Sequence, residues 1–246
     1  MSKTIILLLI TTLVLRLLLS FFPSFEFDQG AFRIWSNRLA ESGPTKFYSS
    51  EIFTNNPVGF LYLLWIWGLI KENLLNGSAF FNANQNYDLL LKLPANISDL
   101  IIASLIYLAV KKRIGQKAGI IGFLLFAINP AIFFNSAIWG QYDSIPALFL
   151  VLSTLALTIK KSPIMATILM ALALAFKPQT IAFIPIFSLI LLYYFKIYDY
   201  IKVTITFIIT AFLIYLPFFP NNPIVFFVSR FMLHSSQFNF NIHPCR

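Results

Sequence analysis

The first break in the hydrophobicity of the chain is the stretch Phe25-Glu26-Phe27-Asp28-Gln29-Gly30-Ala31-Phe32. A long apolar run precedes it, and an amphipathic segment follows it as far as Gly43-Pro44. Two carboxylates, those of Glu26 and Asp28, therefore come directly after a membrane-spanning run. Because an ionised group is costly inside a bilayer, at least one of them is expected at the membrane surface with protein over it.

The composition is typical of an integral membrane protein. Hydrophobic residues make up 59% of the chain and charged residues 11%, and the mean hydropathy is +0.80. So few polar side chains would not cover the surface of a water-soluble domain. The apolar runs are long and lack strict alternation, which indicates spanning helices and not barrel strands. The predicted fold class is all-α, a polytopic transmembrane helical bundle.

A single domain over residues 1–246 is predicted, with a large first extracytoplasmic loop at about residues 23–88. This loop is expected to bear short helices that lie along the membrane. Several predicted spans are shorter than about twenty residues, so some of their ends must borrow loop residues. The predicted spans are about 5–22, 89–110, 118–135, 145–159, 163–175, 181–195 and 203–219.

The apolar stretch Pro57 to Ile70 decides the orientation of the first helix. It is about fourteen residues long, whereas a perpendicular crossing needs roughly twenty. If it lies in the interface, Lys3 is on the same side as the later basic loops, and if it crosses, Lys3 alone breaks the positive-inside rule. The balance favours the interfacial position, which also suits Trp65 and Trp67. The later basic loops are cytoplasmic in both cases, and they hold Lys111 to Lys117, Lys160-Lys161, Lys196 and Lys202.

Most of the net charge of +9 lies in those loops, so it does not indicate a nucleic-acid partner. One cysteine, Cys245, and two histidines without ligand-like spacing predict no intrachain disulfide and no metal site. No cofactor is predicted, and a divalent metal is not excluded.

The first helix is expected to stay uncleaved, because Phe21-Phe22-Pro23 stands where cleavage would need small residues. The tail is expected outside, with Pro223 to Leu233 again too short to span.

Candidate chemistry gathers in the outer loops. Asp28 lies in a loop of roughly sixty-five residues, far longer than a connector needs, which favours a binding or catalytic role. The alternative is that Asp28 caps the helix implied by Phe32, Trp35 and Leu39. We interpret Asp28 as the reacting group and its neighbour Glu26 as a substrate contact.

A second outer turn reads Trp139-Gly140-Gln141-Tyr142-Asp143-Ser144. Aromatic faces stack on sugar rings, and amide and carboxylate groups match vicinal hydroxyls, so Trp139, Gln141, Tyr142 and Asp143 suit a polyhydroxylated ligand. Asp143-Ser144 before Ile145-Pro146 is also a good helix start, and both interpretations can hold at once.

Lys177 follows a predicted span at its outer end, where the charge bias disfavours lysine unless an anion accompanies it. A lipid phosphate, a pyrophosphate or an Asp would serve, and the alternative is a lysine that snorkels to the headgroups. Gln179 beside it and Arg33 in the first loop are further candidate substrate contacts. Arg33, Arg38 and Lys92 are outer positive charges that could attract an anionic donor, and the alternative is that they contact lipid headgroups.

Arg16 and Asp99 are ionisable residues inside predicted spans. Because unpaired charges there are costly, they are expected to pair across a helix interface, in a structural role more than a catalytic one.

These pieces together resemble the membrane-embedded GT-C glycosyltransferases that use polyprenyl-phosphate sugars. The likeness is closest to the branch that contains the catalytic subunit of GPI mannosyltransferase I and related bacterial and archaeal mannosyltransferase-like proteins. The segments that carry the resemblance are Phe27-Asp28 with Trp35, Gly43-Pro44 with Tyr48, Asn56-Pro57, Lys92-Leu93 with Asp99, Asn129-Pro130, Trp139 to Ser144, and Lys177-Pro178.

The resemblance implies that Asp28 is the catalytic aspartate of a large first outer loop. It would act as general base on the acceptor hydroxyl while a lipid phosphate leaves with inversion at the sugar, and Lys177 would steady that phosphate. Gln141 stands where the related enzymes carry further acidic residues. The resemblance therefore does not identify which sugar or which acceptor this chain would use. Family members also usually have several more spans, so the chain is expected to be an N-terminal part or a truncated form.

The predicted function is a hexosyltransferase of the cell membrane that moves a sugar, with mannose suggested, from a polyprenyl phosphate. The acceptor would be lipid-linked or on the cell surface, and the active site would be extracytoplasmic. Membrane lipids would be further partners of the chain. The alternative is a polytopic transporter or flippase of a lipid-linked or anionic substrate, with Arg16, Asp99 and Lys177 along its path. A third possibility is a non-catalytic remnant that binds a partner.

Overall fold

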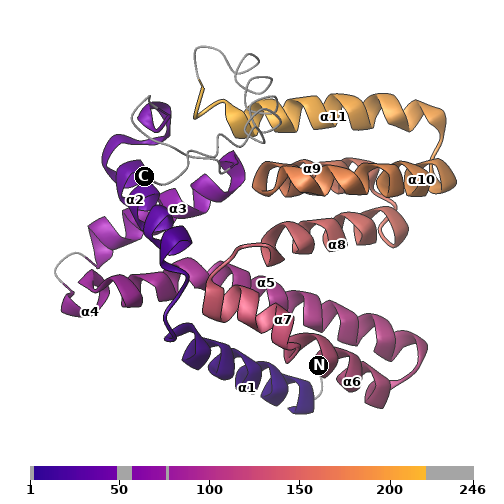
Figure 1. Ribbon diagram of the computed structural model, residues 1–246. Helices are drawn as coiled ribbons and strands as arrows, with labels where there is room; N and C mark the ends of the chain where they lie inside the picture. Colours follow the sequence, from indigo (N-terminus) through magenta and orange to yellow (C-terminus); the bar gives the residue numbers. More distant parts are fainter. Residues whose placement is uncertain (1–2, 49–56, 76–77, 220–246) are drawn as a thin grey trace, which may run out of the picture.

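The computed structural model describes residues 3–48, 57–75 and 78–219. Within these ranges the regular elements are helices and none is a strand, which confirms the all-α prediction (Figure 1). The elements are α1 (Lys3–Ser20), α2 (Glu26–Ser42), the 3₁₀ turn η1 (Pro44–Lys46), α3 (Val58–Leu74), α4 (Ala79–Asn82), α5 (Asn84–Arg113), α6 (Gln116–Ala127), α7 (Pro130–Phe133), the π-helical turn η2 (Phe134–Trp139), α8 (Ser144–Thr158), α9 (Pro163–Phe176), the 3₁₀ turn η3 (Pro178–Phe183), α10 (Ile184–Tyr194) and α11 (Ile197–Tyr215).

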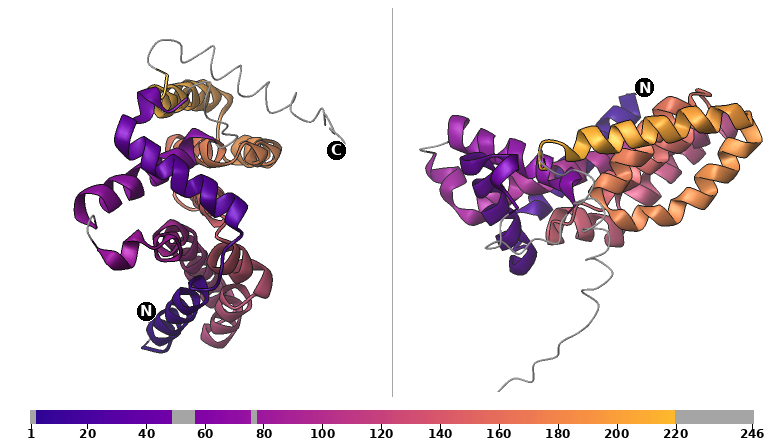
Figure 2. Two further views of the ribbon diagram at one scale, coloured as in Figure 1. Left: turned by 60° about the vertical axis from the view of Figure 1, so that its left-hand side comes forward. Right: turned by 90° about the horizontal axis from the view of Figure 1, so that it is seen from above.

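Three helices in the described ranges, α1, α5 and α11, are long and apolar enough to cross a membrane. The pair formed by α6 and the helix Pro130–Trp139 is a fourth such unit if it counts as one bent span. α8, α9 and η3 with α10 are apolar but shorter. These helices form a stack in Figures 1 and 2, in which α5 packs on α6, α8 on α9 and α9 on α11. Their length and composition are consistent with a membrane protein.

A helix is present at each stretch predicted to span, and the stretch 118–135 is the one that the structure divides. α6 ends at Ala127 and the next helix begins at Pro130, with a bend of 44° between them. Proline lacks a backbone N–H and suits the first turn of a helix. The Asn129 side chain completes this start by accepting a hydrogen bond from the Ala131 backbone N–H at 3.0 Å.

The helices α2 and α3 lie at one end of the stack, as Figures 1 and 2 show from different sides. Gly68 permits their close packing, because a Cβ there would lie 2.3 Å from the Ser36 carbonyl oxygen. α3 also contacts α9, where a Cβ on Gly59 would lie 2.7 Å from the Ala175 backbone. The buried residues that join α2 and α3 are Phe32, Trp35, Leu39, Phe60, Leu61 and Leu64.

The two ends of the stack differ in charge. The turns that join α5 to α6, α8 to α9 and α10 to α11 lie at the end away from α2 and α3 (Figure 1). The basic residues of the predicted cytoplasmic loops lie in these turns or in the helix ends beside them, among them Lys112 near the end of α5 and Lys160 after α8. The segments around Asp28 and Lys177 lie at the other end. The predicted interfacial stretch Pro223 to Leu233 falls outside the described residues.

Candidate functional site

Asp28 lies in the first turn of α2, and its carboxylate bonds to the turn from Trp139 to Ser144. Its Oδ2 accepts a hydrogen bond from Trp139 Nε1 at 2.9 Å and another from Gln141 Nε2 at 2.5 Å. The helix begins earlier, at Glu26, with Phe25 at the capping position and no side-chain cap. The alternative in which Asp28 caps its own helix is therefore wrong, and the carboxylate reaches across to another part of the chain.

The backbone of this turn reverses between η2 and α8. Two successive amides, those of Gly140 and Gln141, donate to the Asn135 carbonyl oxygen at 3.1 and 2.9 Å. Gly140 has a φ of +88°, a conformation that glycine adopts without steric cost. Its carbonyl oxygen accepts a hydrogen bond from Gln29 Nε2 at 2.8 Å, so the turn is fastened to α2 one residue after Asp28.

Side chains alternate along this turn between the site and the protein interior. Trp139 and Gln141 bond Asp28, and Asp143 forms an ion pair with Lys177. Between them, Tyr142 is buried and Ser144 donates to Asp99 in the interior. The polar groups of one face therefore line the site, and those of the other hold the turn in place.

Lys177 follows α9 directly, at the same end of the stack. Its Nζ pairs with the Asp143 carboxylate, and the two side chains are 34% and 43% exposed. Asp143 occupies the capping position of α8, as predicted, but its side chain makes no capping bond. The anion that accompanies Lys177 is thus an Asp within the protein, and the pair is open enough for another anion to reach the ammonium.

Tyr142 is the buried aromatic residue of the same turn. Its ring stacks on Phe60 at 3.8 Å between centroids with an interplanar angle of 11°, and Phe32 meets it edge-on. Burial raises the pKa of the Tyr142 phenol, and the nearby Asp143 and Asp28 charges raise that pKa further. Tyr142 therefore stays protonated, and its ring packs the turn against Phe32 of α2 and Phe60 of α3.

Arg33 and Glu26 form a second ionic group on α2. Arg33 Nη1 donates to both Asp88 oxygens at 2.8 and 2.9 Å, and its Nη2 pairs with Glu26. The Arg33 side chain is 9% exposed, whereas that of Glu26 is 76% exposed. Arg33 is consequently engaged inside the protein, and its predicted contact with substrate stays a prediction, as does that of Glu26. Gln179 is exposed on η3, beyond Lys177.

Arg16 and Asp99 form the ion pair expected from their positions in the sequence. Arg16 Nη1 lies 2.7 Å from Asp99 Oδ2, and the two side chains are 1% and 2% exposed. The guanidinium also donates to Ser136 Oγ at 2.9 Å, to the Ala127 carbonyl oxygen at 2.9 Å and to Asn96 Oδ1 at 3.3 Å. This buried group joins α1, α5, the end of α6 and η2.

Sequence reasoning missed Gln29 and gave Lys92 only a peripheral place. Gln29 is fully buried and donates the hydrogen bond to the Gly140 carbonyl oxygen. In the sequence it is an uncharged residue beside the carboxylate of Asp28, so nothing marked it as a contact of the site. Lys92 is buried, and its Nζ donates to the Ser20 and Phe22 carbonyl oxygens at 2.8 and 3.3 Å. The signal for Lys92 was its place on α5 with Asp88, Asn96 and Asp99, which form a polar face at helical spacing.

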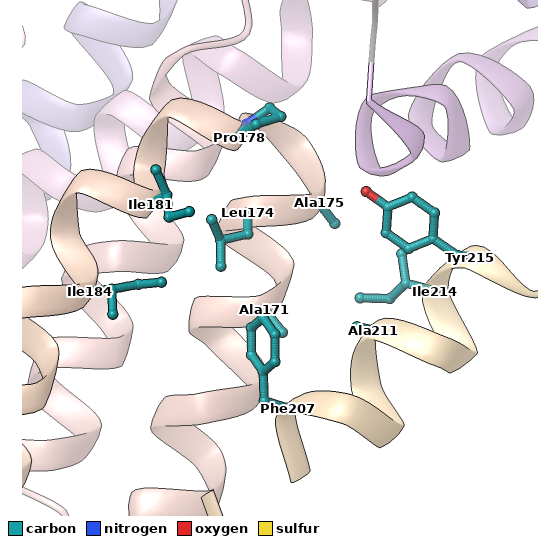
Figure 3. Close-up of a pocket in the computed structure, with 10 residues that line it drawn as sticks. All are labelled: Ala171, Leu174, Ala175, Pro178, Ile181, Ile184, Phe207, Ala211, Ile214 and Tyr215. Atoms are coloured by element: carbon teal, nitrogen blue, oxygen red, sulfur yellow. The ribbon is translucent and has the colours of Figure 1, made fainter. Parts of the chain in front are cut away.

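An apolar cavity lies between α9, η3 and the start of α10 on one side and α11 on the other. It has a volume of about 210 Å³. Figure 3 shows Leu174 and Ala175 of α9 and Ile181 and Ile184 facing the α11 side chains, and the residue after Lys177, Pro178, lies at its edge. The remaining lining residues are Ala171, Phe207, Ala211, Ile214 and Tyr215. Small alanines on two helices leave the space that the cavity occupies.

Among the described residues, no three His, Cys, Asp or Glu side chains are grouped so as to hold a metal ion. No family model, curated protein or solved structure matches the chain.

Proposed function

We propose that the chain is a polytopic membrane glycosyltransferase, which moves one sugar from a polyprenyl phosphate to a lipid-linked or cell-surface acceptor. The active site is extracytoplasmic, at the end of the stack that holds α2 and α3. The observation that carries the proposal is the common attachment of Asp28 and Lys177 to the turn from Trp139 to Asp143. A carboxylate and an ammonium that are both bonded to one short turn supply the two charges that this transfer needs.

Asp28 acts as the general base in this proposal. Its Oδ2 is held by two donors, while the carboxylate remains partly exposed, so a free lone pair can accept the proton of an acceptor hydroxyl. The hydroxyl oxygen attacks the anomeric carbon as the bond from that carbon to the phosphate oxygen breaks. The electron pair of the broken bond leaves with the polyprenyl phosphate, and the sugar inverts.

Lys177 stabilises the departing phosphate, because negative charge develops on the phosphate oxygens as the bond breaks. The phosphate competes with Asp143 for the ammonium, and the exposure of both side chains permits this exchange. The apolar cavity beside Pro178 suits the lipid part of the same donor (Figure 3). Its lining carries almost no polar groups, which favours a hydrocarbon chain over a sugar.

Replacing Asp28 with Asn tests the proposal, because the amide keeps the shape of the side chain and removes its basicity. In proteoliposomes with a radiolabelled polyprenyl-phosphate sugar, transfer should fall by about a hundredfold or more. Glu41→Gln is the matched control, since Glu41 is an exposed carboxylate at the other end of α2. Equal rates for the wild type and Asp28→Asn would remove Asp28 from the mechanism.

The 44° break at Asn129-Pro130 favours a second candidate, a transporter or flippase, because interrupted helices often form transport sites. Its proposed path runs through Arg16, Asp99 and Lys177, of which Arg16 and Asp99 are almost fully buried and bonded to each other. Release of labelled sugar from the donor by purified protein in detergent separates the two candidates. A transporter moves its substrate intact and releases none.

A further inference from the structure

The segment from Ser136 to Ser144 carries the side chains that bond Asp28 and Lys177, and one carboxylate binds both of its ends. Ser136 Oγ donates to Asp99 Oδ2 at 2.6 Å, and Ser144 Oγ donates to Asp99 Oδ1 at 2.5 Å. The first serine belongs to η2 and the second begins α8. Asp99 therefore closes the segment into a loop between two helices.

A carboxylate is suited to this task because it has two oxygens and only accepts hydrogen bonds. Arg16 neutralises its charge at 2.7 Å, and the Asp99 side chain is 2% exposed. Hydrogen bonds to a charged group that water does not reach are stronger than neutral ones, so both serines are held firmly. Arg16 also donates to Ser136, which makes this end of the segment part of the same network.

We propose that Asp99 is a positioning residue of the site. Its carboxylate sets the two ends of the segment so that Trp139 and Gln141 reach Asp28 and Asp143 reaches Lys177. Arg16 acts through Asp99, and neither side chain touches the substrate. The positioning of the segment can be measured by a method that needs no enzymatic activity. The inference rests on the proposed function only where sugar transfer is the readout.

The test is amide hydrogen exchange of the purified protein in detergent, with Ser144→Ala as the first variant. Loss of a hydrogen bond to a charged group should speed exchange over residues 137–143 about tenfold or more, while α1 and α5 keep their wild-type rates. Ser98→Ala is the matched control, because Ser98 lies beside Asp99 and its hydroxyl bonds only its own helix, at the Pro94 carbonyl oxygen, 2.9 Å away. Ser144→Thr restores the hydroxyl and should restore protection.

Unchanged exchange over residues 137–143 in Ser144→Ala would overturn the inference, and so would an equal rise in Ser98→Ala. Ser136→Ala gives the same test from the other end if the first variant does not insert. Where the wild type transfers sugar, Ser144→Ala should lower kcat more than it raises KM, with recovery in Ser144→Thr. If the wild type transfers none and exchange still rises locally, the proposed function fails and the positioning role stands.

Discussion

Lys177 is the residue whose ammonium would exchange its partner Asp143 for the phosphate of the donor. We predict that Lys177→Gln lowers kcat/KM for the lipid donor about ten- to a hundredfold, because a charge-assisted hydrogen bond to the phosphate is lost. Lys177→Arg keeps the charge and should recover most of the rate. Steady-state transfer at varied donor concentration measures both. Lys46→Gln removes an exposed cation from η1, and an equal loss in that control would show that only the overall charge matters.

The residues that sequence predicted correctly are the ones whose charge is unusual in an apolar chain. Arg16 and Asp99 had to pair, since either alone inside a bilayer is costly, and they do. Ser136 and Ser144 gave no such signal, because hydroxyls in helices commonly bond their own backbone carbonyls. Arg33 was predicted as a substrate contact because it is a positive charge in the first loop. Its bond to Asp88 was not foreseen, because that stretch was predicted as loop, whereas α5 begins at Asn84 and brings the carboxylate to it. The catalytic role of Asp28 stays a prediction.

Among the elements, the turn between η2 and α8 depends most on its glycine. A Cβ at Gly140 would lie 2.3 Å from Gln29 Nε2 and 3.2 Å from Lys92 Cε, and the φ of +88° is unfavourable for alanine. We predict that Gly140→Ala lowers the free energy of unfolding by about 2–4 kcal/mol, from backbone strain and crowding together. Gly43→Ala is the control, with a φ of +72° and nothing within 4 Å of its Cβ. Thermal unfolding in detergent should show the larger loss of stability for Gly140→Ala. Equal losses in the two variants would mean that crowding at Gly140 contributes nothing to the effect.

Helix positions were predictable because length and apolarity are properties of the local sequence. The break at Asn129-Pro130 was visible as a proline, but its angle depends on how the following helix packs against α5 and α1. The packing of α2 on α3 was not predictable from pattern either, since it depends on the absence of a side chain at Gly68 opposite Ser36.

For the whole molecule, the separation of charge predicts which end faces the cytoplasm. In a Cys245→Ser background, a cysteine introduced at the exposed Thr45 should react with a membrane-impermeant maleimide from outside intact cells. A cysteine at Ile114, which is 75% exposed in the α5–α6 turn, should react only after permeabilisation. The ratio of labelling before and after permeabilisation measures both sites. Labelling of both from the same side would contradict the proposed orientation.

The turn from Trp139 to Ser144 is held from two directions. Trp139 and Gln141 bond Asp28 and Asp143 pairs with Lys177, while Ser144 bonds the buried Asp99. These partners belong to other parts of the chain, so a residue inserted into the turn would displace at least one of its contacts. The length of this connection is therefore restricted by both groups of contacts together.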